Sequence, residues 1–209
     1  MASGPEILST QLLGEALSAF TPAHQPLRIL DLGPASSATV AFFSQYRCTL
    51  RFADLDPTQL HLSVGNKESV GDEEPAGDEV PGDKTQLQWL QQQLDLPAGS
   101  TFDLCLFWDV LNHLDESGVK ALGALLKPHL HGGSRGHGFA VHNRGAALCH
   151  RIYGILDASQ LVVTAQDESL PLRYPHSQSA LNSTLGCLAA KRSVLRSDGR
   201  LEMVLAAAG

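Results

Sequence analysis

Two short apolar runs that each end in a carboxylate constrain the fold more than any other feature of this sequence. The first, Leu27–Gly33 (LRILDLG), ends with Asp31 and a glycine, and the second, Cys48–Leu55 (CTLRFADL), ends with Asp54. Runs of this kind are typical of parallel strands, which are buried on both faces and lack an alternation of polar and apolar residues. Because Asp54 follows Asp31 by 23 residues, one crossover helix fits between the two strands.

Predicted helices and strands alternate along the rest of the chain, and residues 1–25 form an N-terminal helical segment. Helices are predicted over Pro5–Phe20, Ser36–Tyr46, Thr58–Val64, Thr85–Leu94, Ser117–Leu126, Ala146–Leu156 and Ser179–Ala190. Further strands are predicted over Phe102–Val110, Phe139–His142, Ser193–Arg196 and Leu201–Ala206, and an Asp-Gly pair between the last two indicates a hairpin. The order predicts a single α/β domain over residues 1–209, with a doubly wound, mostly parallel sheet, helices on both faces and a C-terminal antiparallel β-hairpin.

Composition is typical of a cytoplasmic globular protein. The chain has 209 residues, of which 43% are hydrophobic, and this is enough to bury a core. The stretch from Met1 to Phe20 contains no Lys or Arg, and no apolar run reaches the roughly 18–20 residues that span a bilayer. We therefore expect neither a signal peptide nor membrane contact. The four cysteines form no CxxC pair, which favours reduced thiols over disulfides or zinc ligands.

Most of the net charge of −7 is concentrated in one segment. Residues 65–84 (GNKESVGDEEPAGDEVPGDK) contain seven acidic residues and two lysines, without a hydrophobic period. This composition predicts an acidic, flexible insertion, for which a solvated spacer is a better interpretation than an acidic interaction segment. The acidic balance also argues against nucleic acid as a partner, because phosphate contacts need a basic surface.

The ends of the first two strands carry the residues that indicate chemistry. In a doubly wound sheet, ligands bind outside the carboxyl ends of the strands, at the point where the strand order reverses. Gly33 in the first strand-to-helix turn lets the backbone approach a ligand, and Asp54 can accept hydrogen bonds from both hydroxyls of a ribose. The pair predicts an adenosine-containing ligand.

Four segments resemble the motif series of class I S-adenosylmethionine (SAM)-dependent methyltransferases, a family with a Rossmann-like fold. They are ILDLGPASSATVAFF, FADLDPTQL, FDLCLFWDVLNHL and LKPHLHGG, and they cover roughly residues 26–142. The resemblance implies SAM as the cofactor and an adenine contact at the end of a third strand, in the region Asp83–Asp95. It implies further cofactor contacts for Asp31, Gly33, Ser36, Asp54, Leu55 and Asp109.

The first motif departs from the family pattern. Ala35 and Ser37 stand where the family often has its second and third glycine, and Pro34 has no N–H to offer. Ser36 or Ser37 can compensate by donating its hydroxyl to the SAM carboxylate at the start of the following helix. We expect Ala35 at negative φ, because Pro34 beside it fixes an ordinary backbone angle.

The sequence identifies no catalytic residue and no metal site. His113 is a candidate proton acceptor near the methyl group, although a structural hydrogen bonder is the preferred interpretation. The other histidines between 129 and 150 lack metal-ligand spacing and are expected on loops. The Tyr-Pro-His turn at 174–176 is equally well interpreted as an acceptor-site element or a surface turn. In many small methyltransferases the segment that covers the active site corresponds to the one holding Arg144, Tyr153, Arg173, Tyr174 and His176.

Three functions remain open. The leading hypothesis is a SAM-dependent methyltransferase that acts on a small-molecule or protein acceptor. The alternative is a methyltransferase-like fold without catalysis that serves as a binding or scaffold subunit, and the degenerate glycine motif favours it. A nicotinamide-dependent oxidoreductase fits Asp54, but the sequence lacks the G-x-G-x-x-G pattern that such enzymes use.

Overall fold

Two β-sheets form the framework of the computed structural model, which describes residues 4–18, 20, 26–56, 81–141, 150–166 and 174–208. The larger sheet has the strand order β3-β2-β4-β5-β9-β8, in which β3, β2, β4 and β5 run parallel while β9 is antiparallel to β5 and β8. Its strands are β2 (Leu27–Asp31), β3 (Cys48–Phe52), β4 (Leu104–Trp108), β5 (Arg135–Val141), β8 (Leu188–Leu195) and β9 (Arg200–Ala207). The predicted α/β fold with a C-terminal antiparallel hairpin is therefore confirmed.

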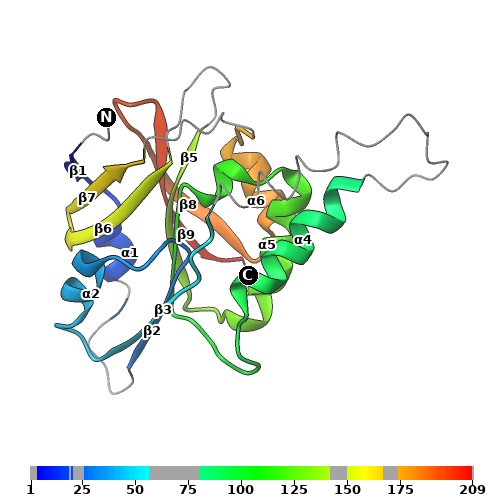
Figure 1. Cartoon of the computed structure of the whole chain (residues 1–209), viewed down its shortest axis with the longest axis horizontal. Helices are drawn as coiled ribbons and strands as arrows, with labels where there is room; N and C mark the ends of the chain where they lie inside the picture. Colours follow the sequence, from blue (N-terminus) through cyan, green and yellow to red (C-terminus); the bar gives the residue numbers. More distant parts are fainter. Residues whose placement is uncertain are drawn as a thin grey trace.

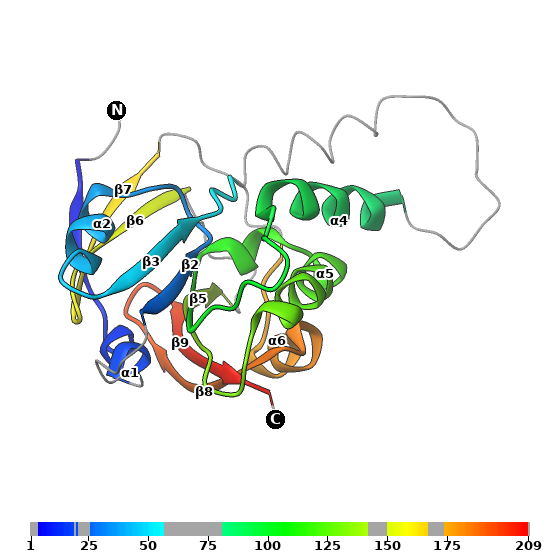
Figure 2. The same ribbon diagram turned by 90° about the horizontal axis from the view of Figure 1, so that it is seen from below.

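The smaller sheet is antiparallel, with the order β1-β7-β6. Its strands are β1 (Glu6–Ser9), β6 (Arg151–Asp157) and β7 (Gln160–Ala165). It lies beside the larger sheet on the side of α1 and α2, while α4, α5 and α6 lie on the opposite side (Figures 1 and 2). The helices are α1 (Leu13–Ser18), α2 (Ser37–Phe43), α4 (Pro81–Leu94), α5 (Glu116–Leu126) and α6 (Gln178–Leu185), with short 3-10 helices η1 (Val110–His113) and η2 (Lys127–His129). None of the helices in the described ranges is long and apolar enough to cross a bilayer.

The central strand β4 explains why the sequence forms two cores. All five of its residues are buried, and alternate side chains of a strand point to opposite faces. Leu104 and Leu106 pack with α1, α2 and the small sheet, whereas Cys105 and Phe107 pack with α4, α5 and α6. A strand with both faces covered must be apolar throughout, which is the pattern that made it recognisable.

Two helix predictions are wrong, because both segments contain strands that pair with β7. The predicted helix Pro5–Phe20 is helical only over Leu13–Ser18, since Glu6–Ser9 pairs with β7. The predicted helix Ala146–Leu156 contains β6 from Arg151 onward. Pairing within a sheet overrides a local helical spacing, whether the partner is distant, as for β1, or adjacent, as for β6.

Two boundaries also differ from prediction. The predicted helix Ser179–Ala190 ends at Leu185, where Gly186 adopts φ 63° and turns the chain into β8. The predicted helix Thr85–Leu94 is confirmed as α4, but it begins earlier, at Pro81, within the segment 65–84 predicted to be flexible. The region Asp83–Asp95, in which the resemblance implied an adenine contact at a strand end, therefore lies largely in this helix. Residues 57–80, which include the predicted helix Thr58–Val64 and most of that acidic segment, lie outside the described residues.

A buried carboxylate joins the N-terminal segment to the large sheet. The Glu202 side chain is fully buried and accepts hydrogen bonds from the backbone N–H of Leu12 at 2.8 Å and from Arg196 at 2.9 Å. Other donors to it are the Thr10 hydroxyl, the Gln11 N–H at 3.1 Å and the His137 imidazole at 3.0 Å. Burial alone would raise the pKa of Glu202, but hydrogen bonds from His137, Thr10 and Gln11 outweigh it and hold the pKa well below its ordinary value of 4.5.

Replacing Glu202 with glutamine should therefore destabilise the fold by about 3–5 kcal/mol, because buried donors and Arg196 lose their charged acceptor. The measurement is the free energy of unfolding in denaturant at pH 7. The matched control is Glu15→Gln, whose ion pair with Arg192 is exposed and worth under about 1 kcal/mol.

The difference between wild type and Glu202→Gln should also depend on pH. A carboxylate with a lowered folded-state pKa contributes fully above its unfolded value of 4.5, and the contribution is lost as the pH falls below it. A difference that stays constant between pH 7 and pH 3 would contradict this account.

Candidate functional site

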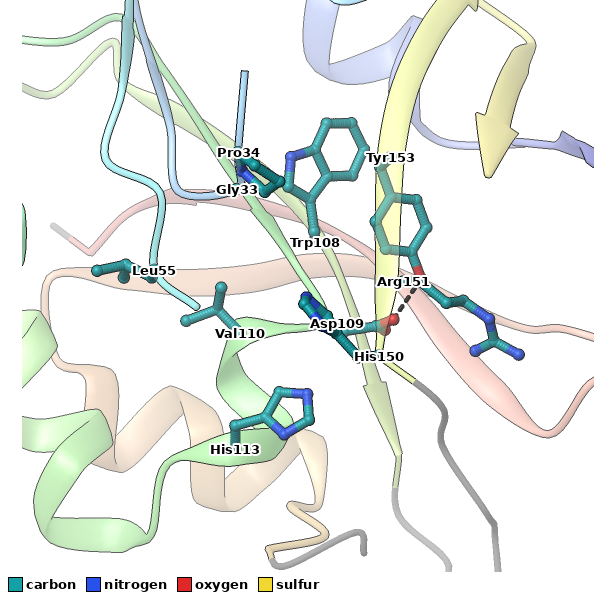
Figure 3. A pocket seen from close by; sticks show the side chains of 10 residues that line it. All are labelled: Gly33, Pro34, Leu55, Trp108, Asp109, Val110, His113, His150, Arg151 and Tyr153. Atoms are coloured by element: carbon teal, nitrogen blue, oxygen red, sulfur yellow. Dashed lines mark hydrogen bonds between the residues drawn. The ribbon is translucent and has the colours of Figure 1, made fainter. Parts of the chain in front are cut away.

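A narrow pocket lies at the carboxyl ends of β2, β3 and β4 (Figure 3). It encloses about 350 Å³, counting its open mouth. Chain connections from β2 and β4 lead to helices on opposite sides of the sheet, so the pocket lies at the topological switch point where α/β folds bind ligands. Its lining residues are Gly33, Pro34, Leu55, Trp108, Asp109, Val110, His113, His150, Arg151 and Tyr153.

The turn after β2 forms the first wall of the pocket. Gly33 does not have positive φ, and its lack of a side chain matters instead for a close approach, because a Cβ there would lie 3.0 Å from Cδ1 of Trp108. Ala35 is likewise absent from the described residues with positive φ, as predicted. Ser36 is the N-cap of α2, but its hydroxyl makes no capping bond and faces β6, where a Cβ on Gly154 would lie 2.5 Å from it. Ser36 is outside the pocket lining.

Asp31 lies at the base of this turn and is completely buried. Its Oδ1 accepts hydrogen bonds from the Gly33 N–H at 2.9 Å and from the Trp108 indole N–H at 2.6 Å. Its Oδ2 has no hydrogen-bond partner among the residues that the structure describes. Burial raises the pKa of Asp31 to about 7, because the two donors offset only part of the lost hydration.

The turn after β3 forms the opposite wall of the pocket with Leu55, whereas Asp54 lies outside the pocket lining. The Asp54 N–H donates to the Gly33 carbonyl at 3.2 Å, and the Leu55 N–H donates to the Leu32 carbonyl at 2.8 Å, so the two turns are joined. Leu55 is buried and lines the pocket, whereas the Asp54 carboxylate is exposed. Asp54 has φ 50°, a conformation that aspartate tolerates better than most residues.

Trp108, which sequence analysis did not single out, dominates the centre of the pocket. It ends β4 with φ 47°, which is a strained conformation for a bulky residue. The indole stacks on the Tyr153 ring with centroids 5.0 Å apart and planes 3° apart. Its place directly before Asp109 in FWDVLNHL was the available signal, but nothing local predicts where the ring points.

Asp109 lines the pocket, but its carboxylate is bound to protein groups. It accepts a hydrogen bond from the Tyr153 hydroxyl and lies 3.3 Å from the Arg200 guanidinium, which also donates to that hydroxyl. Burial, followed by the Asp109 charge, raises the pKa of Tyr153 well above its ordinary value. Asp109 is thus a pocket wall whose orientation is set by β6 and β9.

The structure separates the remaining candidates. His113 lines the pocket, while His129 and His131 lie at the opposite end of β4, near Ser100 and Asp103. His176 donates its backbone N–H to Val141 and contacts the Leu114 carbonyl, so the Tyr-Pro-His turn lies outside the pocket lining. Arg144 and Arg173 lie outside the described residues. Among the described ranges, no group of three or more histidine, cysteine or acidic side chains is placed to hold a metal.

Comparisons with known proteins find solved structures with a distantly similar fold, several of which are SAM-dependent methyltransferases. The pyocyanin biosynthetic protein PhzM is 14% identical over 94% of this chain and 54% of its own, with a TM-score of 0.47. A SAM-dependent methyltransferase from Clostridium acetobutylicum is 14% identical over 87% of this chain and 84% of its own (TM-score 0.46). The 1,6-didemethyltoxoflavin-N1-methyltransferase of Burkholderia thailandensis is 15% identical over 95% of this chain and 76% of its own, with a TM-score of 0.46.

The chain thus spans about half the length of PhzM and about three quarters or more of the other two. No protein-family model and no curated protein sequence matches it. At these identities the likeness concerns the fold, and no substrate is carried over from it.

Replacing Asp31 with asparagine should change how stability depends on pH. In wild type, folded Asp31 keeps its proton up to about pH 7 whereas the unfolded chain loses it near 3.8, so stability falls as the pH rises between these values and then levels off. The variant has no such titrating group. Its free energy of unfolding should therefore exceed that of wild type by up to about 4 kcal/mol at pH 8, and by little below pH 4.

Denaturant unfolding at pH 4, 6 and 8 measures this effect. Asp95→Asn is the control, because the Asp95 side chain is 92% exposed and should give the same result as wild type at each pH. If the difference in free energy of unfolding between Asp31→Asn and wild type did not grow with pH, the buried Asp31 would already be ionised over the whole range from pH 4 to pH 8.

Proposed function

We propose that this protein binds SAM in the pocket between the β2, β3 and β4 ends and transfers its methyl group to a small-molecule or protein acceptor in the cytoplasm. The observation that carries the proposal is the pair of joined turns at the switch point, one with a glycine that admits close approach and one with an exposed carboxylate. These are the two features that an adenosine ligand needs at this edge of an α/β sheet.

The residues present fit the adenosine half of SAM. Asp54 would accept hydrogen bonds from the ribose hydroxyls, and Leu55 and Val110 offer apolar walls to the adenine. Asp31 would act from beneath the turn by holding the Gly33 N–H. The Ser36 hydroxyl faces β6. Ser36 is therefore a candidate for contact with the SAM carboxylate only because it stands at the start of α2.

When bound, SAM supplies a methyl group on a sulfonium centre, which is transferred by in-line displacement. The residues around the pocket then mainly provide proximity, orientation and exclusion of water. Asp109 and Tyr153 form a rigid wall, because each is hydrogen-bonded to the other and to Arg200. Two imidazoles, those of His113 and His150, line the pocket and are candidates to take a proton from an acceptor.

A binding or scaffold protein without catalysis is the second candidate. It is favoured by the Trp108 ring, which fills the space next to Gly33, and by the commitment of Asp109 to protein partners. The two functions differ in turnover. The test offers small-molecule and protein fractions of a cell extract as acceptors. S-adenosylhomocysteine should be formed from SAM only if the protein is a methyltransferase.

S-adenosylhomocysteine should bind and raise the melting temperature. A ligand at 100 times its dissociation constant adds about 2.7 kcal/mol to the free energy of unfolding. Calorimetry and thermal shift measure this, with NAD as the control ligand, because the sequence lacks the dinucleotide pattern. Binding of NAD alone would replace the SAM proposal with a nicotinamide site.

Asp54→Asn should weaken that binding by about 1.5–3 kcal/mol, roughly ten- to a hundredfold in Kd, because the ribose loses a charged acceptor. Asparagine also tolerates positive φ, so the backbone of the turn is preserved. The matched control is Asp95→Asn, another exposed aspartate at positive φ, which follows α4 and not one of the strand ends beside the pocket. Equal losses in both variants would show that Asp54 does not contact the ligand.

A further inference from the structure

The Trp108 indole lies against the glycine turn (Figure 3). Its Cδ1 would be 3.0 Å and its Nε1 3.3 Å from a Cβ placed on Gly33, so the ring fills the side on which this glycine is open. Any ligand group that approached the Gly33 backbone from the pocket would meet the indole first. The pocket is therefore closed at this end by one of its own side chains.

Two contacts hold the ring in this place against backbone strain. The indole N–H donates to Asp31 at 2.6 Å, and the ring stacks on Tyr153. The Trp108 backbone has φ 47° and interrupts the pairing of β4 with β5, where the register shifts between Leu106 and Trp108. A bulky residue in this conformation persists only while its surroundings enforce it. If a ligand took the place of the hydrogen bond that the indole N–H makes to Asp31, the ring would therefore be released toward an unstrained conformation.

We propose that Trp108 is the residue that sets ligand affinity in this pocket, because ligand binding displaces its indole from Gly33. The inference rests on the proposed SAM site and concerns the end of the pocket next to the glycine turn. When only a fraction of molecules has the indole displaced, the apparent dissociation constant equals the intrinsic constant divided by that fraction. Trp108 then controls affinity without being a catalytic residue.

Asp31 supplies the differential interaction that such a displacement needs. It accepts from Trp108 and Gly33 through Oδ1, and its buried Oδ2 has no partner within the described part of the chain. Once the indole leaves, only the Gly33 N–H remains as a donor. A ligand that carries a hydrogen-bond donor or a positive charge at this end restores the lost bond, so it binds the displaced state better than the closed one.

A single-tryptophan protein tests the displacement directly. The chain has two tryptophans, and Trp89 lies in α4 on the other side of the sheet, so Trp89→Phe leaves Trp108 as the only indole fluorophore. Trp108 is 3% exposed. Titration of this variant with S-adenosylhomocysteine should shift the emission to longer wavelength, with a midpoint equal to the Kd from calorimetry.

Trp108→Phe gives a second, independent measurement. Phenylalanine has no N–H to bond Asp31, so the closed state loses its main contact and S-adenosylhomocysteine should bind about tenfold more tightly, or better. The matched control is Trp89→Phe, whose Kd should equal that of wild type. If Trp108→Phe fails to fold, the emission titration still decides the question.

The possible results separate the two proposals. Tighter binding by Trp108→Phe, including binding by this variant alone, supports displacement. Binding by the Trp89→Phe protein without any change in Trp108 emission overturns the inference and leaves the SAM site standing. Binding by neither wild type nor Trp108→Phe overturns the SAM site and the inference with it.

Discussion

The hydrogen bonds among Tyr153, Asp109 and Arg200 are the interaction on which the pocket depends. Tyr153 belongs to the small sheet, Asp109 follows β4 and Arg200 begins β9, so one buried cluster joins three parts of the chain at a single point. Arg200 is 2% exposed and lies over the Phe139 ring at 4.8 Å. Burying a guanidinium and a carboxylate is favourable only when both are fully hydrogen-bonded. The cluster therefore specifies one position of the small sheet, and with it the position of the pocket wall.

The parts of the fold that were predictable from sequence are those determined by local composition. Leu27–Asp31 and Leu104–Trp108 are apolar on both faces, and Ser197–Gly199 forms the turn of a hairpin whose strands follow each other directly. Glu6–Ser9 and Arg151–Asp157 were assigned to helices because their pairing partner, β7, supplies the information that their own residues lack. The prediction thus failed at β1, which pairs with a distant strand, and at the β6–β7 hairpin, whose turn carries no Asp-Gly signal.

The candidate site divides in the same way. Gly33, Asp54 and Leu55 stand at strand ends, where a parallel sheet determines the edge to which they belong, and their two turns are joined by backbone hydrogen bonds. Trp108 and Arg200 could not be found in this way. The position of the indole depends on a positive φ and on the Asp31 acceptor, and Arg200 reaches the pocket wall from the far end of the sequence. Such contacts are settled by packing rather than by any motif.

Positive φ at two neighbouring strand ends, strained for Trp108 and tolerated by Asp54, favours a functional interpretation of this edge over a purely structural one. Among the described residues, three besides glycine have positive φ, and two of these, Asp54 and Trp108, flank the Gly33 turn on either side of β2. Neither conformation stabilises the sheet, because each one ends the regular pairing of its strand. What each does is direct a side chain: the Asp54 carboxylate stays in solvent beside the pocket, and the Trp108 ring lies on the glycine. Positive φ at both strand ends thus sets the direction of two side chains at the switch point, which is where α/β folds bind their ligands.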